Sequence, residues 1–421
     1  EVRLNRLKRC ISLLNDYEEK IIKTLKLDFK VRSSDEIKIS EIDQSIRNLK
    51  FTIGNLRKWM KPIRRRASFG AGLLGAKSIM QPSPLGAVGI IAPWNFPLGM
   101  IFYPAASIFA SGNSIMAKPS EITFHTAELI KEAVEKYFDP AEFAICLGGP
   151  KIGEDFSKLK LDHLLYIGSN RIAKKVLFNS SKNLVPTTLE LGGKSPTIIS
   201  DDADLHLAAK RILFAKTLNA GQICLAPDYV FLKRGLERNF IEELKKVFDD
   251  FYPEGSQNDY TSMVNVAHYK RINEVLADSI SKGAKVTQLG QFDSKNKNLI
   301  TPKVLTSVND KMLVMKEEIF GPLLPVLSYD NLREVTEYIN NHDRPLGLYF
   351  FGNRRKEQKD IIENTRSGGV TINDAVFHLL QSRLPFGGVG ESGYGFYHGY
   401  EGFLNFSNLR SIYHQTNNDA L

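Results

Sequence analysis

The residue with the clearest chemical potential is Cys224, which ends the small-residue segment Asn219-Ala-Gly-Gln-Ile-Cys224 behind a helical stretch. A free thiol has a pKa of ~8.5, so only a few per cent of it is thiolate at neutral pH. A nucleophilic cysteine therefore needs a site that lowers this pKa or a base that removes the proton. Because a cysteine in a globular chain is more often an inert buried side chain, the neighbouring segments must decide between these two interpretations.

Two upstream residues could complete such a site. Glu190 emerges at the end of an apolar run and precedes two glycines, where partial desolvation would raise its pKa toward the range of a general base. Its alternative interpretation is an ordinary carboxylate at the end of a strand. Asn95 lies in Pro93-Trp-Asn-Phe-Pro97, a turn made rigid by two prolines. An amide fixed in this way could donate a hydrogen bond to a developing oxyanion.

Other catalytic motifs are missing or misplaced. The histidines are scattered, no His-Glu-x-x-His occurs and no two cysteines are close in sequence, so no metal site is predicted. Gly-x-Ser-x-Gly is also missing, which argues against a serine nucleophile. Gly-x-Gly-x-x-Gly occurs at residues 70–75 and 388–393, but neither copy lies between a predicted strand and a helix. A dinucleotide would therefore bind here without that fingerprint.

Length and composition narrow the class of protein. The chain has 421 residues, of which 43% are apolar and 24% charged. These values indicate a globular protein of about two to three domains and exclude disordered, collagen-like and disulfide-scaffold proteins. No run approaches the ~18 to 20 apolar residues of a membrane helix, and the first residues lack a signal-peptide core. Since the chain does not begin with Met, we expect it to be a fragment of a longer protein.

Charge and cysteine content bear on partners and compartment. The net charge of +9 raises the hypothesis of an anionic partner. The dense basic run Arg64-Arg65-Arg66 has no interleaved aromatic residues, so we do not expect nucleic-acid binding. The three cysteines cannot all pair, which favours reduced thiols and a cytoplasmic protein.

Hydrophobic spacing predicts the elements that must position these residues. Apolar residues at helical spacing predict helices over residues 4–25 and 40–60, and residues 63–86 are predicted to be an extended or hairpin segment. From residue 87 onward, short apolar strands alternate with helices, which is typical of a parallel sheet wound with helices. A second α/β block is predicted to begin near residue 190. We therefore predict an α/β fold.

The candidate residues belong to a set of motifs that resembles the NAD(P)-dependent aldehyde dehydrogenase superfamily. In the family's order, the motifs are Pro93-Trp-Asn-Phe-Pro97, Lys118-Pro-Ser-Glu121, Glu190-Leu-Gly-Gly-Lys, Gly221-Gln-Ile-Cys224, Glu318-Ile-Phe-Gly-Pro322 and Pro385-Phe-Gly-Gly388. Glu190 and Cys224 are 34 positions apart, the family's separation. The resemblance covers practically the whole chain, and six motifs in order are far more specific than any one of them.

Two further segments indicate a branch of the superfamily. Cys224-Leu-Ala-Pro-Asp-Tyr229 and Tyr397-His-Gly399 resemble the branch that holds the class 3, fatty-aldehyde and coniferyl-aldehyde enzymes. The tetrameric branch typically carries Trp-Lys shortly after the Asn turn, where this chain has Tyr103-Pro104. The family's Thr-Gly-Ser is Ile167-Gly168-Ser169 here, so one contact beside the nicotinamide departs from the family pattern.

The resemblance implies an aldehyde dehydrogenase-like fold with two α/β domains. A Rossmann-like NAD-binding domain is expected over residues 1–68 and 85–190, and a catalytic domain over 191–395. An oligomerisation hairpin and a C-terminal arm are expected over 69–84 and 396–421, which together imply a homodimer. Because residues 415–420 are polar, the membrane-anchored fatty-aldehyde variant is not expected.

The resemblance also assigns roles to individual residues. Cys224 is the expected nucleophile, Asn95 and the Cys224 N–H the holders of the oxyanion, and Glu190 the base that activates water against the thioester. The residues expected to bind the cofactor are Trp94, Lys118, Glu121, Gly168, Ser169, Glu318 and Phe320. Among them, Lys118 and Glu121 would contact the adenosine ribose. Glu318 would bind the nicotinamide ribose and Phe320 would pack against the nicotinamide. A carboxylate at position 121 repels a 2′-phosphate, so NAD is favoured, although Lys118 would allow NADP.

The predicted function is NAD(P)-dependent oxidation of an apolar or aromatic aldehyde, of the coniferaldehyde type, through a cysteine thiohemiacetal and a thioester. Medium-chain or fatty aldehydes are the alternative substrates. Aromatic residues in or beside the site motifs could line an apolar channel or simply pack in the core; they are Phe96, Phe386, Phe396 and Tyr397. The presence of Glu190 argues against a CoA-acylating enzyme, and the retention of all three catalytic candidates argues against a structural protein on the same scaffold.

Overall fold

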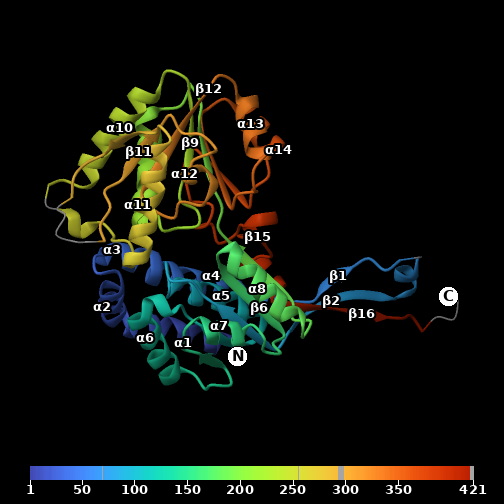
Figure 1. The fold of residues 1–421 in the computed structure, drawn as a ribbon. Coiled ribbons are helices and arrows are strands. Elements are labelled where there is room, and N and C mark those ends of the chain that lie inside the picture. The colour runs from blue at the N-terminus through green and yellow to red at the C-terminus, as the bar shows by residue number, and fades with distance from the viewer. Residues whose placement is uncertain (69, 255, 293–297, 418–421) are drawn as a thin grey trace.

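The computed structural model describes residues 1–68, 70–254, 256–292 and 298–417. Phe69 and residues 418–421, at the limits of the predicted hairpin and arm, lie outside this part, as do residues 255 and 293–297 of the predicted catalytic segment. Figure 1 shows two α/β bodies and a narrow arm that projects from one of them. All the predicted site residues belong to the described part.

The body that contains the N-terminus is built on a six-stranded sheet in the order β15-β7-β6-β3-β4-β5. Its neighbouring strands are parallel, except that β15 pairs antiparallel with β7. Short, nearly continuous apolar sequences form the central strands because both faces of this sheet are covered. The strands are β3 (Ala87–Ile91), β4 (Ser114–Lys118), β5 (Phe143–Ile145), β6 (His163–Gly168), β7 (Thr187–Leu191) and β15 (Gly393–Tyr394).

Alternate residues of the strands in this sheet pack against two different helical layers. In β6, Leu165 and Ile167 belong to the large core shared with the N-terminal helices, whereas Leu164 and Tyr166 belong to a smaller core with α7 and α8. This division follows from the two-residue period of a strand. The helices are α1 (Val2–Asp16), α2 (Glu18–Phe29), α3 (Ser34–Ile37), the π-helix η1 (Lys38–Asp43), α4 (Gln44–Trp59), α5 (Gly99–Ser111), the short η3 (Glu121–Thr123), α6 (Phe124–Tyr137), α7 (Pro150–Phe156), α8 (Asn170–Ser181) and α15 (Gly399–Asn405).

The second body contains a seven-stranded sheet in the order β10-β11-β12-β9-β8-β13-β14, with only the β10–β11 pair antiparallel. Its first strand is β8 (Pro196–Ile199), as expected for a second α/β block that begins near residue 190. The other strands are β9 (Tyr229–Lys233), β10 (Lys285–Gln288), β11 (Lys303–Thr306), β12 (Leu323–Tyr329), β13 (Gly347–Phe351) and β14 (Gly369–Ile372). The helices are α9 (Leu205–Thr217), η4 (Leu218–Gly221), α10 (Glu237–Phe251), η5 (Ser256–Asp259), α11 (Val266–Ser281), α12 (Leu313–Lys316), α13 (Leu332–Asn340) and α14 (Arg355–Asn364).

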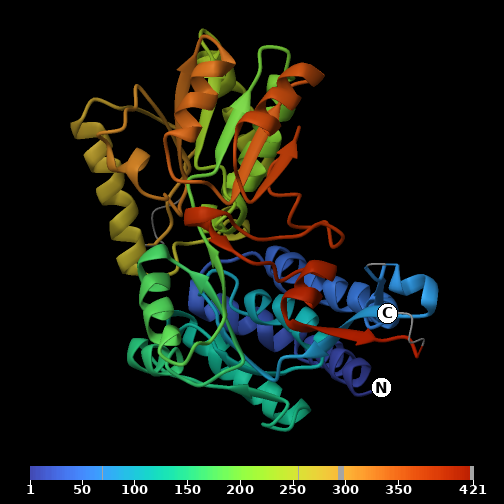
Figure 2. The same cartoon turned by 90° about the vertical axis from the view of Figure 1, so that its right-hand side faces the viewer.

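The arm is a three-stranded antiparallel sheet in the order β1-β2-β16. It joins β1 (Ile63–Arg65), β2 (Lys77–Pro84) and β16 (Ser407–His414), with η2 (Ala71–Leu74) between the first two strands. Figures 1 and 2 show it extending beyond the body that contains the N-terminus. Strand pairing crosses the predicted domain boundaries at two places. β1 precedes residue 69 but belongs to the arm, and β15 lies in the predicted catalytic segment but joins the first sheet. The domain boundaries stay a prediction.

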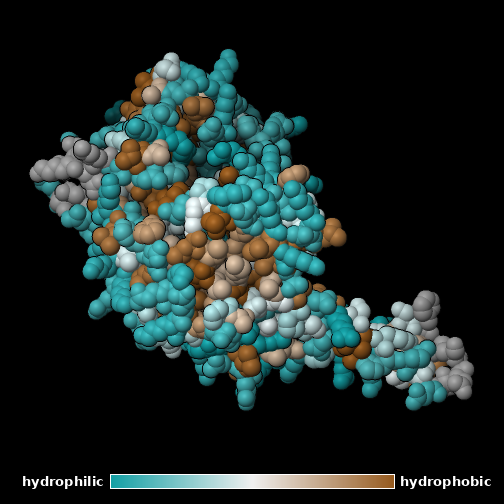
Figure 3. All heavy atoms as spheres, turned by 60° about the horizontal axis from the view of Figure 1, so that its bottom comes forward, coloured by the Kyte–Doolittle hydropathy of each residue, from teal (hydrophilic) through white to brown (hydrophobic). Residues whose placement is uncertain are grey.

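The surface of the molecule is uneven in polarity. On the face seen in Figure 3, apolar side chains gather in a patch on the body, and the arm carries mainly polar and mixed residues. Among the described residues, no helix is long and apolar enough to cross a bilayer.

Candidate active site

The segments that carry the predicted site residues meet at the carboxyl ends of the parallel strands of the first sheet. The turn at residues 93–96 follows β3, Gly168 ends β6 and is followed by Ser169, and Glu190 lies near the end of β7. The carboxyl ends of parallel strands share one edge of a sheet, which is the usual place for a ligand in an open α/β fold. Cys224 comes to this edge from the second body, after η4 and before β9.

A cavity of about 260 Å³ lies at this edge. Its lining combines the predicted catalytic residues with an apolar wall: Pro93, Trp94, Asn95, Phe96, Met100, Ile167, Gly168, Ser169, Glu190, Gly192, Ile223, Cys224, His268, Arg271, Glu318, Phe320, Leu379, Phe386 and Tyr397. Eight of the ten predicted site residues are in this set, because only Lys118 and Glu121 lie outside it. The structure therefore brings together residues that are up to 226 positions apart in the sequence, from Trp94 to Phe320.

Lys118 and Glu121 lie at the end of the neighbouring strand β4. The Lys118 side chain is buried, and its Nζ is 2.6 Å from Glu121 Oε2. The two groups thus form an ion pair beside the cavity, and their predicted contact with an adenosine ribose stays a prediction.

The backbone before Cys224 has an unusual conformation. Asn219, Ala220 and Gly221 have φ angles of 48°, 52° and 72°, all in the left-handed region. For the two non-glycine residues this conformation costs about 1–3 kcal/mol each, so surrounding contacts must hold it. Gly221 has no room for a side chain, since a Cβ there would lie 2.6 Å from the Gly321 carbonyl oxygen. The turn points Cys224 into the cavity.

Buried amide groups connect this turn to the turn that holds Asn95. Asn95 Nδ2 donates to the Gln222 carbonyl oxygen at 3.0 Å, and Asn219 Nδ2 donates to the Asn95 carbonyl oxygen at 3.0 Å. Gln222 is anchored in turn, because its Oε1 accepts from the Val264 N–H at 3.0 Å. An amide nitrogen carries two N–H groups, so Asn95 can hold this bond and still offer a donor to the cavity.

The Cys224 thiol and the Glu190 carboxyl both line the cavity and are close enough that each shifts the pKa of the other. Burial raises the pKa of Glu190 to about 7, and the nearby thiol offsets part of this effect. Burial and the carboxyl groups of Glu190 and Glu318 raise the pKa of the Cys224 thiol well above its ordinary value. Glu190 Oε1 is buried without a partner among the described residues. The thiol is therefore held in its protonated form beside a base that titrates near neutral pH.

Glu318 and Phe320 form the opposite wall, on a segment fixed by a buried ion pair. Asp228 pairs with Lys194 and also accepts from the Ile319 N–H at 2.9 Å. Phe320 has a φ of 47°, and its ring meets that of Trp94 edge-on at 5.3 Å. Burial and the nearby Asp228 charge raise the pKa of Glu318 to about 8.

The residues of this wall fit a nicotinamide cofactor. Glu318 Oε1 is buried without a partner in the described part of the chain, and such an acceptor suits the hydroxyl groups of a ribose. Gly192 leaves space for this carboxylate, since a Cβ there would lie 2.1 Å from Glu318 Oε2. The aromatic rings of Trp94 and Phe320 provide flat apolar surface beside it. A cluster of His, Cys, Asp or Glu side chains that could hold a metal ion was not found in the described residues.

Sequence reasoning missed two polar residues of the cavity, His268 and Arg271. The His268 ring lies 4.6 Å from the Trp94 ring, and burial lowers the pKa of this imidazole to about 4, so it is neutral. Arg271 Nη2 donates to the carbonyl oxygen of Ile319, beside Glu318. Both lie in the first turns of α11, three residues apart, so their helical spacing was a signal that they share a face. Of the four aromatic residues considered for a substrate channel, only Phe396 is outside the lining.

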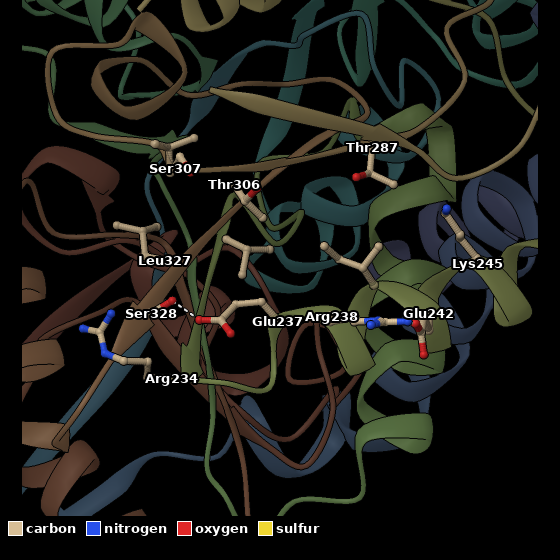
Figure 4. Close-up of a pocket in the computed structure, with 13 residues that line it drawn as sticks. Arg234, Glu237, Arg238, Glu242, Lys245, Thr287, Thr306, Ser307, Leu327 and Ser328 are labelled. Carbon is tan, nitrogen blue, oxygen red and sulfur yellow. Dashed lines mark hydrogen bonds and ion pairs between the residues drawn. The ribbon is translucent and has the colours of Figure 1, made fainter. Parts of the chain in front are cut away.

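A second hollow of about 730 Å³ lies between α10 and the strands β11 and β12 (Figure 4). Four of its five charged side chains are engaged with other charged or polar groups: Arg234 with Asp330, Arg238 with Glu242 and Glu237 with Ser328. It contains no thiol and no unpartnered buried acid or base in the described part of the chain. The chemistry of this protein is therefore assigned to the smaller cavity.

Comparison with known proteins agrees with this geometry. The sequence profile of the aldehyde dehydrogenase family matches residues 1–412. A probable coniferyl aldehyde dehydrogenase of Caulobacter vibrioides is 43% identical over 425 aligned positions, which cover 100% of this chain and 88% of that protein. The coniferyl aldehyde dehydrogenase of a Pseudomonas species is 41% identical, with coverage of 98% and 86%. The solved structure of the substrate-bound state of Staphylococcus aureus AldH is 33% identical and superposes with a TM-score of 0.93, covering 99% of this chain and 90% of that one.

Proposed function

This chain belongs to the aldehyde dehydrogenase family and is an NAD(P)-dependent oxidoreductase, and from that premise we propose that it oxidises bulky apolar or aromatic aldehydes, of the coniferaldehyde type, to carboxylic acids. The observation that carries this proposal is a thiol beside a buried, partly unpartnered carboxyl inside a cavity with an apolar wall. A thiol supplies the nucleophile, the carboxyl supplies the base, and the wall supplies affinity for apolar substrates.

In the first step of the proposed mechanism, the Cys224 sulfur attacks the aldehyde carbon and its proton passes to the nearby Glu190 carboxylate. The carbonyl oxygen becomes an oxyanion, which the Asn95 side-chain amide and the Cys224 backbone N–H stabilise. Such preorganised donors are worth about 10²–10³ in rate each. Asn95 is suited to this role because its own backbone and side chain are fixed by the Asn219 and Gln222 amides.

The next step depends on the cavity wall formed by Glu318 and Phe320. Glu318 would hold the nicotinamide ribose, and Trp94, Gly168, Ser169 and Phe320 are the other lining residues that would contact the cofactor. When bound, NAD(P) supplies the acceptor for the hydride of the tetrahedral carbon, which turns the bound aldehyde into a thioester of Cys224. Glu318 is supported in this role by its unpartnered buried oxygen.

Deacylation completes the cycle and is the main task of Glu190. Glu190 first releases to solvent the proton that it took from Cys224, which is the proton that the overall reaction sets free. Its carboxylate then takes a proton from a water molecule, whose oxygen attacks the thioester carbon. The oxyanion forms again on the same donors, the carbon–sulfur bond breaks, and the proton held by Glu190 returns to the sulfur as the carboxylic acid leaves. A pKa of about 7 suits this role, because the group is an effective base near neutral pH and can also return the proton.

The substrate class follows from the apolar part of the lining. Phe96, Met100, Leu379, Phe386 and Tyr397 give the cavity aliphatic and aromatic surface. Each methylene buried against such a wall contributes ~0.8 kcal/mol, so kcat/KM should rise several-fold per added carbon until the channel is full. Aromatic walls add about 0.5–1.5 kcal/mol for a stacked ring. The names of the two coniferyl-aldehyde relatives support the same class.

A panel of aldehydes tests the proposed function. NADH formation is measured with coniferaldehyde, cinnamaldehyde, octanal and acetaldehyde, with and without CoA. We expect kcat/KM for coniferaldehyde to exceed that for acetaldehyde by at least tenfold, with no requirement for CoA. A ratio at or below one would overturn the substrate class, and a preference for octanal over coniferaldehyde would favour the medium-chain alternative. A strict requirement for CoA would refute hydrolysis by Glu190.

We further propose that NAD is preferred over NADP and that the protein is a cytoplasmic homodimer. The cofactor preference is supported by Glu121, whose charge opposes a 2′-phosphate, although its pairing with Lys118 leaves NADP some access. The homodimer is supported by the projecting arm (Figure 1), whose outer strands β1 and β16 each pair with one neighbour in the described sheet and so leave an edge that another chain could pair with. The compartment is supported by the free thiols of all three cysteines. Light scattering of the intact protein tests the dimer, since a monomeric mass would exclude it.

A further inference from the structure

Three charged residues of the N-terminal segment form a buried group beside the active site. They are Arg32, which follows α2, Glu36 in α3 and Glu41 in η1, and they are here called the N-terminal charge cluster. Arg32 Nε is 3.0 Å from Glu36 Oε1, and Arg32 Nη1 is 2.9 Å from Glu41 Oε1. The Arg32 and Glu41 side chains are fully buried. The guanidinium also lies 5.1 Å from the ring of Phe96, which is part of the cavity wall.

Glu41 connects this cluster to the turn that carries Asn95. Its Oε2 accepts hydrogen bonds from the Leu98 N–H at 3.1 Å and the Gly99 N–H at 2.8 Å. These are N–H groups at the start of α5, which have no partner within the helix and form its positive end. The buried carboxylate thus fixes where α5 begins, four residues after Asn95.

Glu36 connects the same cluster to the turn that carries Cys224. Its Oε2 accepts from the Asn219 N–H at 3.0 Å and lies 3.3 Å from the Thr261 hydroxyl oxygen. Asn219 is the first of the three left-handed residues that precede the thiol. The carboxylate therefore holds the backbone at the point where it departs from ordinary geometry.

We propose that Arg32, Glu36 and Glu41 are positioning residues that hold the Asn95 turn and the Cys224 turn in mutual register. The proposal rests on the oxyanion role proposed for those two turns, because the two donors come from separate segments and must converge on one oxygen. A misplacement of about 1 Å in such a site lowers rates by about 10²-fold. If the fold needed only packing at this place, apolar residues would serve as well, since buried ion pairs contribute little net stability. Both carboxylates instead direct their second oxygen to a catalytic turn.

The test compares two reactions of Cys224 that need no oxidation. With p-nitrophenyl acetate, the sulfur attacks the acyl carbon, the thiol proton and nitrophenolate leave, and water then hydrolyses the thioester. This reaction passes through an oxyanion. Iodoacetamide alkylates the same sulfur by displacing iodide and forms no oxyanion. We expect E36Q and E41Q each to slow acylation by the ester about 10- to 100-fold while alkylation changes less than threefold. R32K, which keeps the charge, should show a smaller loss of acylation rate. It replaces E36Q and E41Q in the test if those variants do not fold.

Glu142 offers a matched control in the same N-terminal layer. It pairs with Arg6 and Arg9 of α1 at 3.0 and 2.7 Å, but it contacts neither catalytic turn. E142Q should therefore lower the melting temperature and leave both reactions of Cys224 unchanged. Because E36Q and E41Q disturb one shared register, their combined effect on acylation should be smaller than the product of the single effects.

The proposal is overturned if the cluster variants lower only the melting temperature, as E142Q does, with ester acylation within threefold of wild type. It is also overturned if acylation and alkylation fall together, because that result indicates general loss of the folded site. Failure of the proposed function is a separate outcome, since it would appear as the absence of aldehyde-dependent NADH formation by the wild-type protein.

Discussion

Replacing Glu190 by Gln should separate the two halves of the reaction. Gln keeps the size of the side chain but cannot accept a proton, and loss of a general base lowers the rate of its step by about 10²–10⁴. The step that suffers most is deacylation, because water is a far weaker acid than a thiol. The attack by Cys224 is partly spared, since the Glu190 charge is one of the causes that raise the thiol pKa and the substitution removes it.

The pKa of Glu190 sets the expected pH dependence. With a value of about 7, roughly a tenth of the carboxyl groups are ionised at pH 6 and roughly nine tenths at pH 8. Where deacylation limits turnover, the wild-type rate should rise about tenfold between these values and then level off. E190Q should show a slow rate without this rise.

Stopped-flow absorbance of NADH is the assay. We expect E190Q to produce a burst of about one NADH per subunit, followed by turnover reduced at least a hundredfold. E318Q is the control within the same cavity, and it should raise KM for the cofactor while keeping the pH profile. Turnover of E190Q within tenfold of wild type, with an unchanged pH profile, would refute the assignment of the base. A loss of deacylation in E318Q instead would transfer that role to Glu318, and a missing burst in E190Q would move Glu190 to an earlier step.

Four further outcomes are expected. C224S should abolish dehydrogenase activity and leave NAD binding intact in a fluorescence titration, and activity within tenfold of wild type would exclude Cys224 as the nucleophile. E190Q should raise the free energy of unfolding at pH 8 by up to about 3 kcal/mol but not at pH 4, measured by urea denaturation. The sign follows because the unfolded carboxyl ionises above about pH 4.5 and the folded one only above about 7, so folding is penalised as pH rises through this window. E121Q should lower the NAD-over-NADP ratio of kcat/KM several-fold, and an unchanged ratio would remove Glu121 from cofactor selection. M100A should extend the range of preferred alkanals by one or two carbons, and an unchanged chain-length profile would place Met100 outside the substrate channel.

The order of strands and helices was predictable because it depends on local patterns. The apolar runs at β3, β4 and β7 are short and flanked by glycine, proline or polar residues, and the structure has the alternation of strands and helices that these runs predict from residue 87 onward. The antiparallel β15 was missed, since a two-residue strand leaves no periodic signal. The pairing of β16 with β2 joins residues more than 320 positions apart, and local pattern cannot supply such a contact.

The candidate site could be predicted from the sequence only for residues that belong to a recognisable motif. Residue type and resemblance made Cys224, Glu190 and Asn95 candidates. In the fold, Asn95 and Glu190 lie at the common edge of β3, β6 and β7, and Cys224 reaches this edge from the second body. His268 and Arg271 carry no motif and come from a helix more than 40 residues after Cys224, so only the packing of α11 reveals them. The N-terminal charge cluster was hidden for the same physical reason, because a buried ion pair looks in sequence like surface charges at helical spacing.

Two ion pairs near the active site differ in whether their contact could be predicted from the sequence. Lys118 and Glu121 are three residues apart in a motif, and their direct contact follows from that spacing. Lys194 and Asp228 are far apart in the sequence, yet their ion pair fixes the segment of Glu318, because Asp228 also accepts a hydrogen bond from the Ile319 N–H. Pairs of the second kind need the tertiary fold, which brings the loop after β7 against the strand β9.

In the proposed mechanism the aldehyde becomes a thioester of Cys224 that Glu190 must hydrolyse, and mass spectrometry of the peptide that carries Cys224 detects this thioester. E190Q is mixed with NAD and coniferaldehyde, quenched in acid and digested, and the peptide that contains residue 224 is weighed. The account predicts an adduct on Cys224 equal to the aldehyde mass minus two hydrogens, formed only when NAD is present. An unmodified Cys224, an adduct with the full aldehyde mass, or an acyl group on another residue would contradict it.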